Sequence, residues 1–243
     1  MKVAVLSDIH GNGIALNYAI RDLKELGISK VIILGDVVMK GPMPAQVLEM
    51  LNNDKDLGIL AWIKGNTDMW FEEISEAWIP SSDKEKQLYS YYKYAKDRLN
   101  EDQIVFIKKL PFEYSLLLNR IKILCVHGTP QSIVEAIDNS VSEGDIKKAV
   151  NDVKEQLILC GHSHTSFIGE VDNKKIFNVG SVGNSLDGDN RISYGILDFS
   201  ENEVKLVNRR IEYPINKVID ISIKNEFPFM DDYKSIILNA SMN

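Results

Sequence analysis

The sequence is poor in cysteine and histidine, and it contains no long uninterrupted apolar run. Cys125 and Cys160 are its two cysteines, and each lies inside an apolar run. We therefore expect buried free thiols in a reducing compartment, with no need for a disulfide. No apolar stretch approaches the roughly 18 residues of a transmembrane helix. The short apolar start ends at Asp8 without the apolar core and cleavage site of a signal peptide, so we expect a cytoplasmic protein without membrane association.

Basic residues are fewer than acidic residues, 28 against 35, and the formal net charge is −7. This balance disfavours a broad grip on a phosphate backbone, so nonspecific nucleic-acid binding is not expected. The hydrophobic fraction of 44% is ordinary for a folded globular chain, and 243 residues can bury a large core. We expect a single domain over residues 1–243, and the composition does not indicate its oligomeric state.

The first part of the chain alternates short apolar runs with helical patterns. Apolar runs at residues 2–6, 31–34 and 58–63 predict buried strands, and apolar residues at helical spacing predict helices over 13–26 and 42–51. Strand, helix and strand in this order form a βαβ unit, which makes the strands parallel neighbours in one sheet. The sequence therefore predicts an α/β protein.

A segment over about residues 69–110 interrupts this rhythm, and we interpret it as a helical insertion. Helices are expected around 70–78, 83–99 and 101–110, the last with Asn100 as its N-cap. The segment carries many aromatic side chains. Packing on the sheet is the favoured explanation for them, and a lid over the site is the alternative.

Beyond residue 110 the chain is rich in strand patterns, and we interpret this half as antiparallel. A hairpin is expected over 113–126, followed by a helix over 146–153. Later strands are expected at residues 157–160, 167–171, 174–179, 193–199 and 204–210. The tail from Tyr213 is weakly patterned and suggests no role.

Polar residues that can bind a metal ion directly follow five of the predicted strands. In chain order these blocks are Asp8-x-His10, Gly35-Asp36, Gly65-Asn66-Thr67-Asp68, His127-Gly128 and Gly161-His162-x-His164. Each block alone has a plain structural explanation, such as a helix N-cap for Asp8 or a turn position for Asn66. All four histidines of the chain lie in these blocks, however, and open α/β sheets place their sites at the carboxyl ends of strands. The combination therefore predicts one functional site.

Carboxylate, amide and imidazole donors together suit borderline divalent cations such as Mn²⁺, Fe²⁺, Zn²⁺ or Ni²⁺. Seven donors are too many for one ion. A bridging carboxylate would let them hold two ions, which is the arrangement that clamps the attacking and leaving oxygens in phosphoryl displacement.

The ordered pattern D-x-H, G-D, G-N, H-G, G-H-x-H resembles the calcineurin-like metallophosphoesterase superfamily, and the resemblance covers residues 3–199. The stretch Asn178-Val-Gly-Ser-Val-Gly183 looks like the small bacterial and archaeal phosphodiesterase branch of that superfamily. In that branch the segment usually reads Asn-Pro-Gly-Ser-Val-Gly followed by Gln-Pro-Arg. Val179 and the segment 184–186 depart from this pattern, so the resemblance does not assign a substrate role to this loop.

The resemblance implies a four-layer α/β/β/α sandwich with two central mixed sheets. It also implies two divalent metal ions, with Mn²⁺ as the first choice and Fe, Zn or Ni as alternatives. The first ion would be bound by Asp8, His10 and His164, the second by Asn66, His127 and His162, and both by a bridging Asp36. A metal-bridging hydroxide would then hydrolyse a phosphoester, which makes the protein a phosphodiesterase or phosphatase of small phosphorylated substrates.

Further residues near these blocks are candidates for catalysis or substrate binding. Asp36 and Asn66 are candidate catalytic residues as well as metal ligands. Thr67 occupies the position where many relatives carry a histidine as general acid. Asp68 is expected to be ionised and could orient water. Asn12 could contact substrate or cap the first helix, and capping is favoured. Arg191 could bind phosphate or be a solvated surface charge. Lys64 is expected at the surface.

Two other function classes compete with hydrolysis. One is a non-catalytic metal-binding interaction module of the same fold, like a retromer subunit, but such a module would have lost ligands and this chain has lost none. The other is a dinucleotide-binding oxidoreductase, which lacks support because no Gly-x-Gly-x-x-Gly turn follows the first strand.

Overall fold

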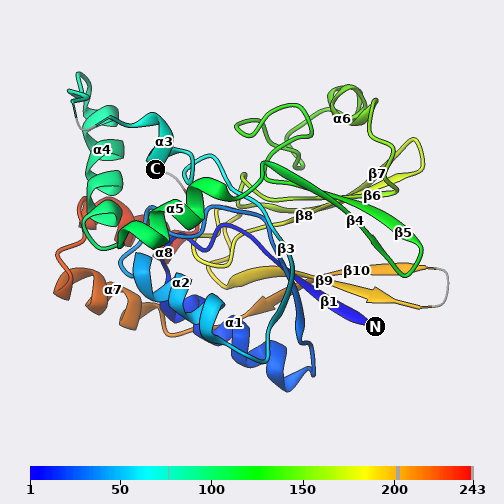
Figure 1. The fold of residues 1–243 in the computed structure, drawn as a ribbon, viewed down its shortest axis with the longest axis horizontal. Helices are drawn as coiled ribbons and strands as arrows, with labels where there is room; N and C mark the ends of the chain where they lie inside the picture. The colour runs from blue at the N-terminus through cyan, green and yellow to red at the C-terminus, as the bar shows by residue number, and fades with distance from the viewer. Residues whose placement is uncertain (76, 201–202, 242–243) are drawn as a thin grey trace.

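Two five-stranded sheets face each other in the computed structural model, which describes residues 1–75, 77–200 and 203–241 (Figure 1). The first sheet has the strand order β10-β9-β1-β2-β3. Its strands are β1 (Lys2–Leu6), β2 (Lys30–Ile33), β3 (Gly58–Trp62), β9 (Ile192–Phe199) and β10 (Val204–Ile211). The first three are parallel, as the βαβ pattern predicts, and β9 pairs antiparallel with β1, so the sheet is mixed.

The second sheet has the order β4-β5-β6-β8-β7. Its strands are β4 (Glu113–Leu118), β5 (Ile121–Val126), β6 (Leu157–Cys160), β7 (Ser166–Val171) and β8 (Lys174–Val179). The prediction that this half is antiparallel is wrong for its centre, because β6 pairs parallel with both β5 and β8. The reason is the helix α6 (Glu143–Val150), which connects β5 to β6 by a crossover and brings the chain back in the same direction.

Apolar side chains fill three layers parallel to the sheets. Between the sheets, residues such as Val5 and Ile32 pack in one cluster with Leu159 of β6. The outer face of the first sheet is covered by α1 (Gly13–Glu25) and α2 (Pro44–Asn53), and the outer face of the second by α6 (Figure 1). The structure is therefore a four-layer α/β/β/α sandwich with two mixed sheets, which confirms the fold that the sequence resemblance implies.

The helical segment consists of α3 (Trp70–Glu73), α4 (Asp83–Lys96) and α5 (Glu101–Lys109). The first helix is shorter than the predicted 70–78, of which residue 76 lies outside the described residues. As predicted, Asn100 caps α5, and Gln103 completes the capping box. The rings of Tyr91 and Tyr94 do not pack on the sheet as predicted. They pack against the C-terminal tail, where Tyr91 stacks on Phe227 with ring centroids 5.4 Å apart.

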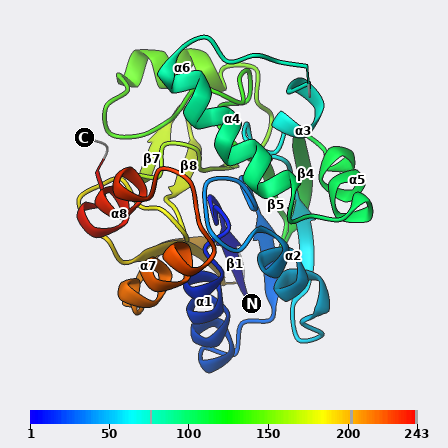
Figure 2. The same ribbon diagram turned by 90° about the vertical axis from the view of Figure 1, so that its left-hand side faces the viewer.

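The partner of α4 is the C-terminal tail, which forms α7 (Ile215–Lys224) and α8 (Met230–Asn239). These three helices face the viewer in Figure 2, and buried residues of all three form one cluster with Phe227. The sequence analysis assigned the tail no role, and the structure shows that it covers the aromatic face of α4. Among the described residues, no helix is long and apolar enough to span a bilayer.

Candidate metal centre

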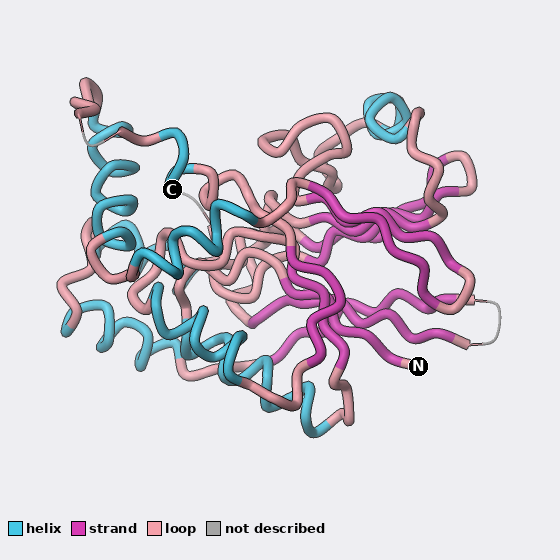
Figure 3. The backbone as a smooth tube through the Cα atoms, in the orientation of Figure 1, coloured by secondary structure: helices cyan, strands magenta, loops and turns pink. Residues whose placement is uncertain are grey.

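The seven donor residues predicted from the sequence lie on loops that follow β1, β2, β3, β5 and β6. Figure 3 shows the loops gathered between the ends of the strands and the helices. Because β1 to β3 belong to the first sheet and β5 and β6 to the second, the donors approach one another from both sheets. Five of them have a left-handed backbone with φ between 47° and 68°, namely Asp8, His10, Asp36, His162 and His164. This conformation is costly for residues other than glycine and is typical of functional sites.

Glycine allows two of these loops to touch. A Cβ atom on Gly161 would overlap Ser7 Oγ and would lie 2.6 Å from Asp8 Oδ2. The loop after β6 can therefore approach the loop after β1 only if residue 161 has no side chain. The contact is then closed by the backbone N–H of His162, which donates to Asp8 Oδ2 at 3.0 Å.

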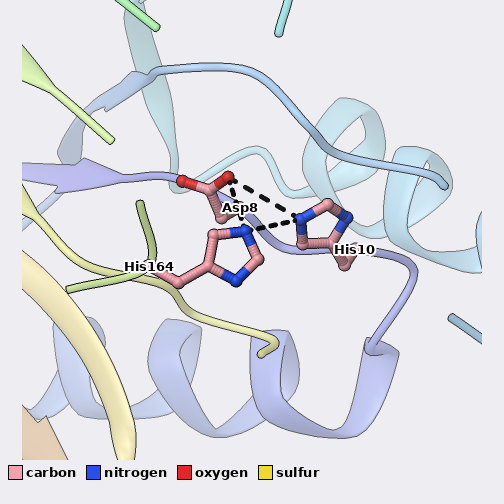
Figure 4. A group of neighbouring side chains, drawn as sticks. All are labelled: Asp8, His10 and His164. Atoms are coloured by element: carbon pink, nitrogen blue, oxygen red, sulfur yellow. Dashed lines mark hydrogen bonds and ion pairs between the residues drawn. The ribbon is translucent and has the colours of Figure 1, made fainter. Parts of the chain in front are cut away.

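The first donor group consists of Asp8, His10 and His164 (Figure 4). Nδ1 of His10 donates to the carbonyl oxygen of Met39 at 3.0 Å, and Nδ1 of His164 donates to that of Asn184 at 2.5 Å. Since a carbonyl oxygen can only accept, each Nδ1 carries the proton and each Nε2 of the neutral rings offers a lone pair. These two Nε2 atoms lie 3.0 Å apart.

A carboxylate oxygen completes this first group. Asp8 Oδ1 lies 3.2 Å from His164 Nε2 and 3.7 Å from His10 Nε2. It is buried without a hydrogen-bond partner among the described residues, whereas Oδ2 accepts from Ser7 Oγ. A buried carboxylate oxygen without a donor is costly unless a cation or a proton compensates its charge.

The second donor group contains Asn66, His127 and His162. Nδ1 of His127 donates to the carbonyl oxygen of Leu34 at 2.7 Å, and Nε2 of His162 donates to that of Val134 at 3.0 Å. The other nitrogens of the two rings lie 3.1 Å and 2.9 Å from Asn66 Oδ1. In the neutral rings three electron-pair donors thus converge with no hydrogen between them, which is the arrangement of metal ligands held by outer hydrogen bonds.

Asp36 lies between the two groups. Its Oδ2 is 3.6 Å from His10 Nε2 and 3.7 Å from His127 Nε2, while its Oδ1 accepts the backbone N–H of Thr67 at 2.9 Å. Asp8 Oδ1 also approaches His127 Nε2, at 3.9 Å. Both carboxylates therefore adjoin both groups, and Asp36 is nearly equidistant from one histidine of each.

The electrostatics of the site favour ionised carboxylates. Without a metal ion, burial would raise the pKa of Asp8, but the positive charges that His164 and His127 carry when they are protonated hold it well below its usual range. Burial acts in the same direction on Asp36, whose pKa His127 and His10 lower. Two buried anions, a buried oxygen without a donor and several imidazole lone pairs fit a borderline divalent cation. The ligand atoms that lie close enough together to hold one belong to Asp8, His10 and His164, and to Asp8, Asp36 and His127.

Thr67 and Asp68 are buried, and neither is open to a substrate. Asp68 Oδ2 accepts the backbone N–H groups of Asp36 at 2.8 Å and of Gly65 at 2.9 Å, so it holds the two ligand-bearing loops together. Burial, and then the charge of Asp36, raise the pKa of Asp68 to about 7, which corrects the expectation of a plainly ionised group. Thr67 Oγ1 has no hydrogen-bond partner among the described residues. The structure thus favours positioning roles for both residues.

The structure also shows the surroundings of Asn12, Arg191 and Lys64. Asn12 caps α1, accepting from the N–H of Ala15 at 3.0 Å, and it has no exposed surface for a substrate contact. Arg191 is exposed and pairs with Asp189 at 2.6 Å, as expected of a surface charge. Lys64 is buried, contrary to expectation, because its ammonium binds Glu72 Oε1 at 2.6 Å.

One cation near the site was missed. Lys40 follows Asp36 on the loop after β2, and its Nζ lies 5.5 Å from the ring centroid of Trp70. In the described part of the chain no carboxylate lies within ion-pair distance of it. Burial is the main cause of the lowered pKa of His10, and the positive charge of Lys40 lowers it further. No spacing rule could have found Lys40, because its position depends on Trp70, thirty residues away.

Both the sequence and the fold are similar to those of known proteins. Residues 1–202 match the family model of the calcineurin-like phosphoesterase superfamily domain. The chain is similar to the uncharacterized protein MJ0912 of Methanocaldococcus jannaschii, with 28% identity over 93% of both chains. Its fold is similar to the hypothetical protein PH1004 from Pyrococcus horikoshii OT3, with a TM-score of 0.85, 20% identity and coverage of 100% and 99% of the two chains. A metallophosphoesterase from Sphaerobacter thermophilus gives a TM-score of 0.77 and 20% identity over 99% of this chain and 100% of that one.

Proposed function

Because the chain belongs to the calcineurin-like phosphoesterase superfamily, we propose that it hydrolyses phosphoester bonds at a centre of two divalent cations, with Mn²⁺ as the first choice. The observation that carries the proposal is the buried Oδ1 of Asp8, which has no hydrogen-bond donor and faces the Nε2 atoms of three histidines. Membership of the superfamily supports hydrolysis in general, and this geometry supports the metal dependence.

The donors divide between the two ions according to their contacts. Asp8, His10 and His164 would hold the first ion, since their ligand atoms converge in Figure 4. Asn66, His127 and His162 would hold the second, and Asp36, which lies between His10 and His127, would bridge both. All seven donors are present, which favours a hydrolase over a non-catalytic module of the same fold.

The ions, when bound, would neutralise phosphoryl oxygens and lower the pKa of a water molecule at the centre. The chain itself fixes the ligand atoms, because a backbone carbonyl orients each of the four imidazoles. Lys40 adds a positive charge near the donors that can attract an anionic substrate. No spare histidine is left to protonate a leaving group, and the hydroxyl of Thr67 is buried.

The test is hydrolysis after removal and return of metal. Chelated protein is assayed with 4-nitrophenyl phosphate and with bis(4-nitrophenyl) phosphate, before and after addition of Mn²⁺ and, as the control ion, of Ca²⁺. We expect Mn²⁺ to restore hydrolysis and Ca²⁺ to fail, since imidazole donors suit the softer cation. Full activity in chelated protein, with metal analysis confirming removal, would contradict the proposal, and so would inactivity of the Mn²⁺-loaded protein towards both esters.

A further inference from the structure

One loop, residues 184–191, holds His164 both by its ring and by its backbone. His164 Nδ1 donates to the carbonyl oxygen of Asn184 at 2.5 Å, and the carbonyl oxygen of His164 accepts the backbone N–H of Leu186 at 3.2 Å. The other ring nitrogen, Nε2, lies 3.2 Å from Asp8 Oδ1 in the first donor group. The position of loop 184–191 therefore determines where one ligand of that group lies.

The same loop is bound to the C-terminal end of α8. The backbone N–H of Gly188 donates to the carbonyl oxygen of Ala240 at 2.9 Å, and Asn190 Nδ2 donates to that of Leu238, also at 2.9 Å. The last carbonyl groups of a helix have no partner within the helix, so donors from outside stabilise them. Loop 184–191 supplies such donors, and α8 in return fixes the position of the loop.

A second contact holds the middle of the loop. Arg210 of β10 pairs with Asp187 and donates to the carbonyl oxygen of Asp189 at 3.3 Å. The helix α8 is itself fixed, because its buried side chains belong to the cluster with α4. Both β10 and α8 follow residue 202, where the match to the family model ends. The loop that orients His164 is thus held by parts of the chain outside the matched stretch.

These hydrogen bonds alternate along the loop. Residues 184 and 186 bind His164, and residues 188 and 190 bind α8. A loop that is bound at only one end samples more positions, and a ligand that it carries must be ordered again when an ion binds. Loss of the contact with α8 should therefore weaken ion binding by His164.

We propose that α8 positions His164 for the first metal ion through loop 184–191, with Asn190 as the positioning residue. This gives the C-terminal tail a role in metal binding. The inference rests on the proposed function for the presence of that ion, whereas the orientation of His164 can be measured without it.

The experiment removes one hydrogen bond between the loop and α8 and follows His164. Asn190→Ala removes the donor to Leu238, and Asn190→Asp keeps the size of the side chain but, when ionised, has no hydrogen to donate. In chelated protein, NMR measures how fast the Nδ1 hydrogens of His164 and His10 exchange with solvent. We expect exchange at His164 to become about threefold faster or more in both variants. Exchange at His10 should not change, because the carbonyl oxygen of Met39, on another loop, accepts its Nδ1 hydrogen.

The same variants are then titrated with Mn²⁺ by calorimetry. We expect one binding step to weaken by about fivefold to tenfold, at or below the low end of the effect of partners that contact a ligand directly. Asn239→Ala is the matched control, because Asn239 is exposed at the same end of α8 and its Nδ2 donates to Ser235 of the same helix. It should change neither exchange nor affinity.

The two readouts separate this inference from the proposed function. Unchanged exchange at His164, or an equal increase at His10, would overturn the positioning role even if the protein hydrolyses esters. Faster exchange at His164 with unchanged affinity for Mn²⁺ would overturn it as well. Faster exchange together with weaker Mn²⁺ binding, in a protein that hydrolyses no ester, would support the positioning role and refute the hydrolase. Circular dichroism of the variants checks that their fold is intact.

Discussion

The Nε2 atoms of His10 and His164 lie 3.0 Å apart although neither, in the neutral ring, has a hydrogen to offer the other. Their Nδ1 protons are already donated to backbone carbonyls from two different loops. Lone pairs at this distance repel unless a positive charge lies beside them, and Asp8 Oδ1 faces the same point. The arrangement therefore favours a cation at this point.

Asp36→Asn should lower both metal content and turnover. The substitution removes the negative charge that lies between His10 and His127, and an amide oxygen can still accept the Thr67 N–H, so the fold should persist. We expect turnover to fall by about 10² or more, as for loss of a strong transition-state contact. Metal analysis and steady-state kinetics measure the effect. The control is Asp56→Asn, which changes an exposed carboxylate near Lys24. A wild-type rate and a wild-type number of bound metal ions in Asp36→Asn would refute the bridging role.

The rate should depend steeply on the pKa of the leaving group. All four histidines are assigned to the proposed centre, and Thr67 Oγ1 is buried, so neither an imidazole nor this hydroxyl is placed to protonate the departing oxygen. A missing general acid costs about 10² to 10⁴ in rate, most for alkoxides. A series of aryl and alkyl esters, measured where chemistry limits the rate, gives the slope. Thr67→Val should show the same slope, and a flat slope in the wild-type protein would reveal another proton donor.

The aromatic cluster of α4 and the C-terminal helices should contribute stability. Phe227 is buried and contacts Tyr91, Tyr94 and Tyr233, with ring centroids 4.7 to 5.4 Å apart. Phe227→Ala should lower the free energy of unfolding by about 3–5 kcal/mol, with metal binding retained. Denaturant unfolding measures it, and the exposed Tyr114, which lies outside this cluster, provides the control substitution. An unchanged unfolding energy with altered substrate preference would instead favour a lid.

Stability should depend on pH through Asp22. Hydrogen bonds from Arg209, and also from Tyr194, lower the pKa of Asp22 in the folded chain. The contribution of Asp22 to stability is therefore complete above about pH 4, which is its pKa in the unfolded chain. This contribution is lost as the pH falls through the lower pKa of Asp22 in the folded chain. Asp22→Asn should cost about 1–3 kcal/mol at pH 7 and much less at pH 3. Urea unfolding at both values measures this, with the exposed Asp97→Asn as control. A cost that does not shrink in acid would exclude the charge as its origin.

The elements that could be predicted are those whose signal is local. The strand β1 and the hairpin of β4 and β5 have the predicted bounds, because an apolar run or two runs around Asn119-Arg120 suffice to define them. The donor residues could be predicted together because each directly follows a strand. Their left-handed backbone conformations have no signature in residue type, so the direction of each side chain was not predictable.

The features that were missed depend on contacts between distant segments. Lys64 is buried because Glu72 and the carbonyl oxygen of Lys108 bind its ammonium, and its neighbours in sequence do not indicate this. The parallel pairing of β6 depends on a crossover rather than on the composition of β6 itself. The C-terminal helices are organised by their contact with α4, which the weak pattern of the tail does not encode.

The central claim, two cations at one hydrolytic centre, is tested most directly by counting metal against activity. Chelated protein is titrated with Mn²⁺ while bound metal per chain and hydrolysis of bis(4-nitrophenyl) phosphate are followed in the same sample. We predict that activity rises to its plateau only as the second equivalent binds, because in the proposed centre each donor group would hold one ion and Asp36 would bridge the two. Full activity at one bound equivalent, or with none, would contradict the account.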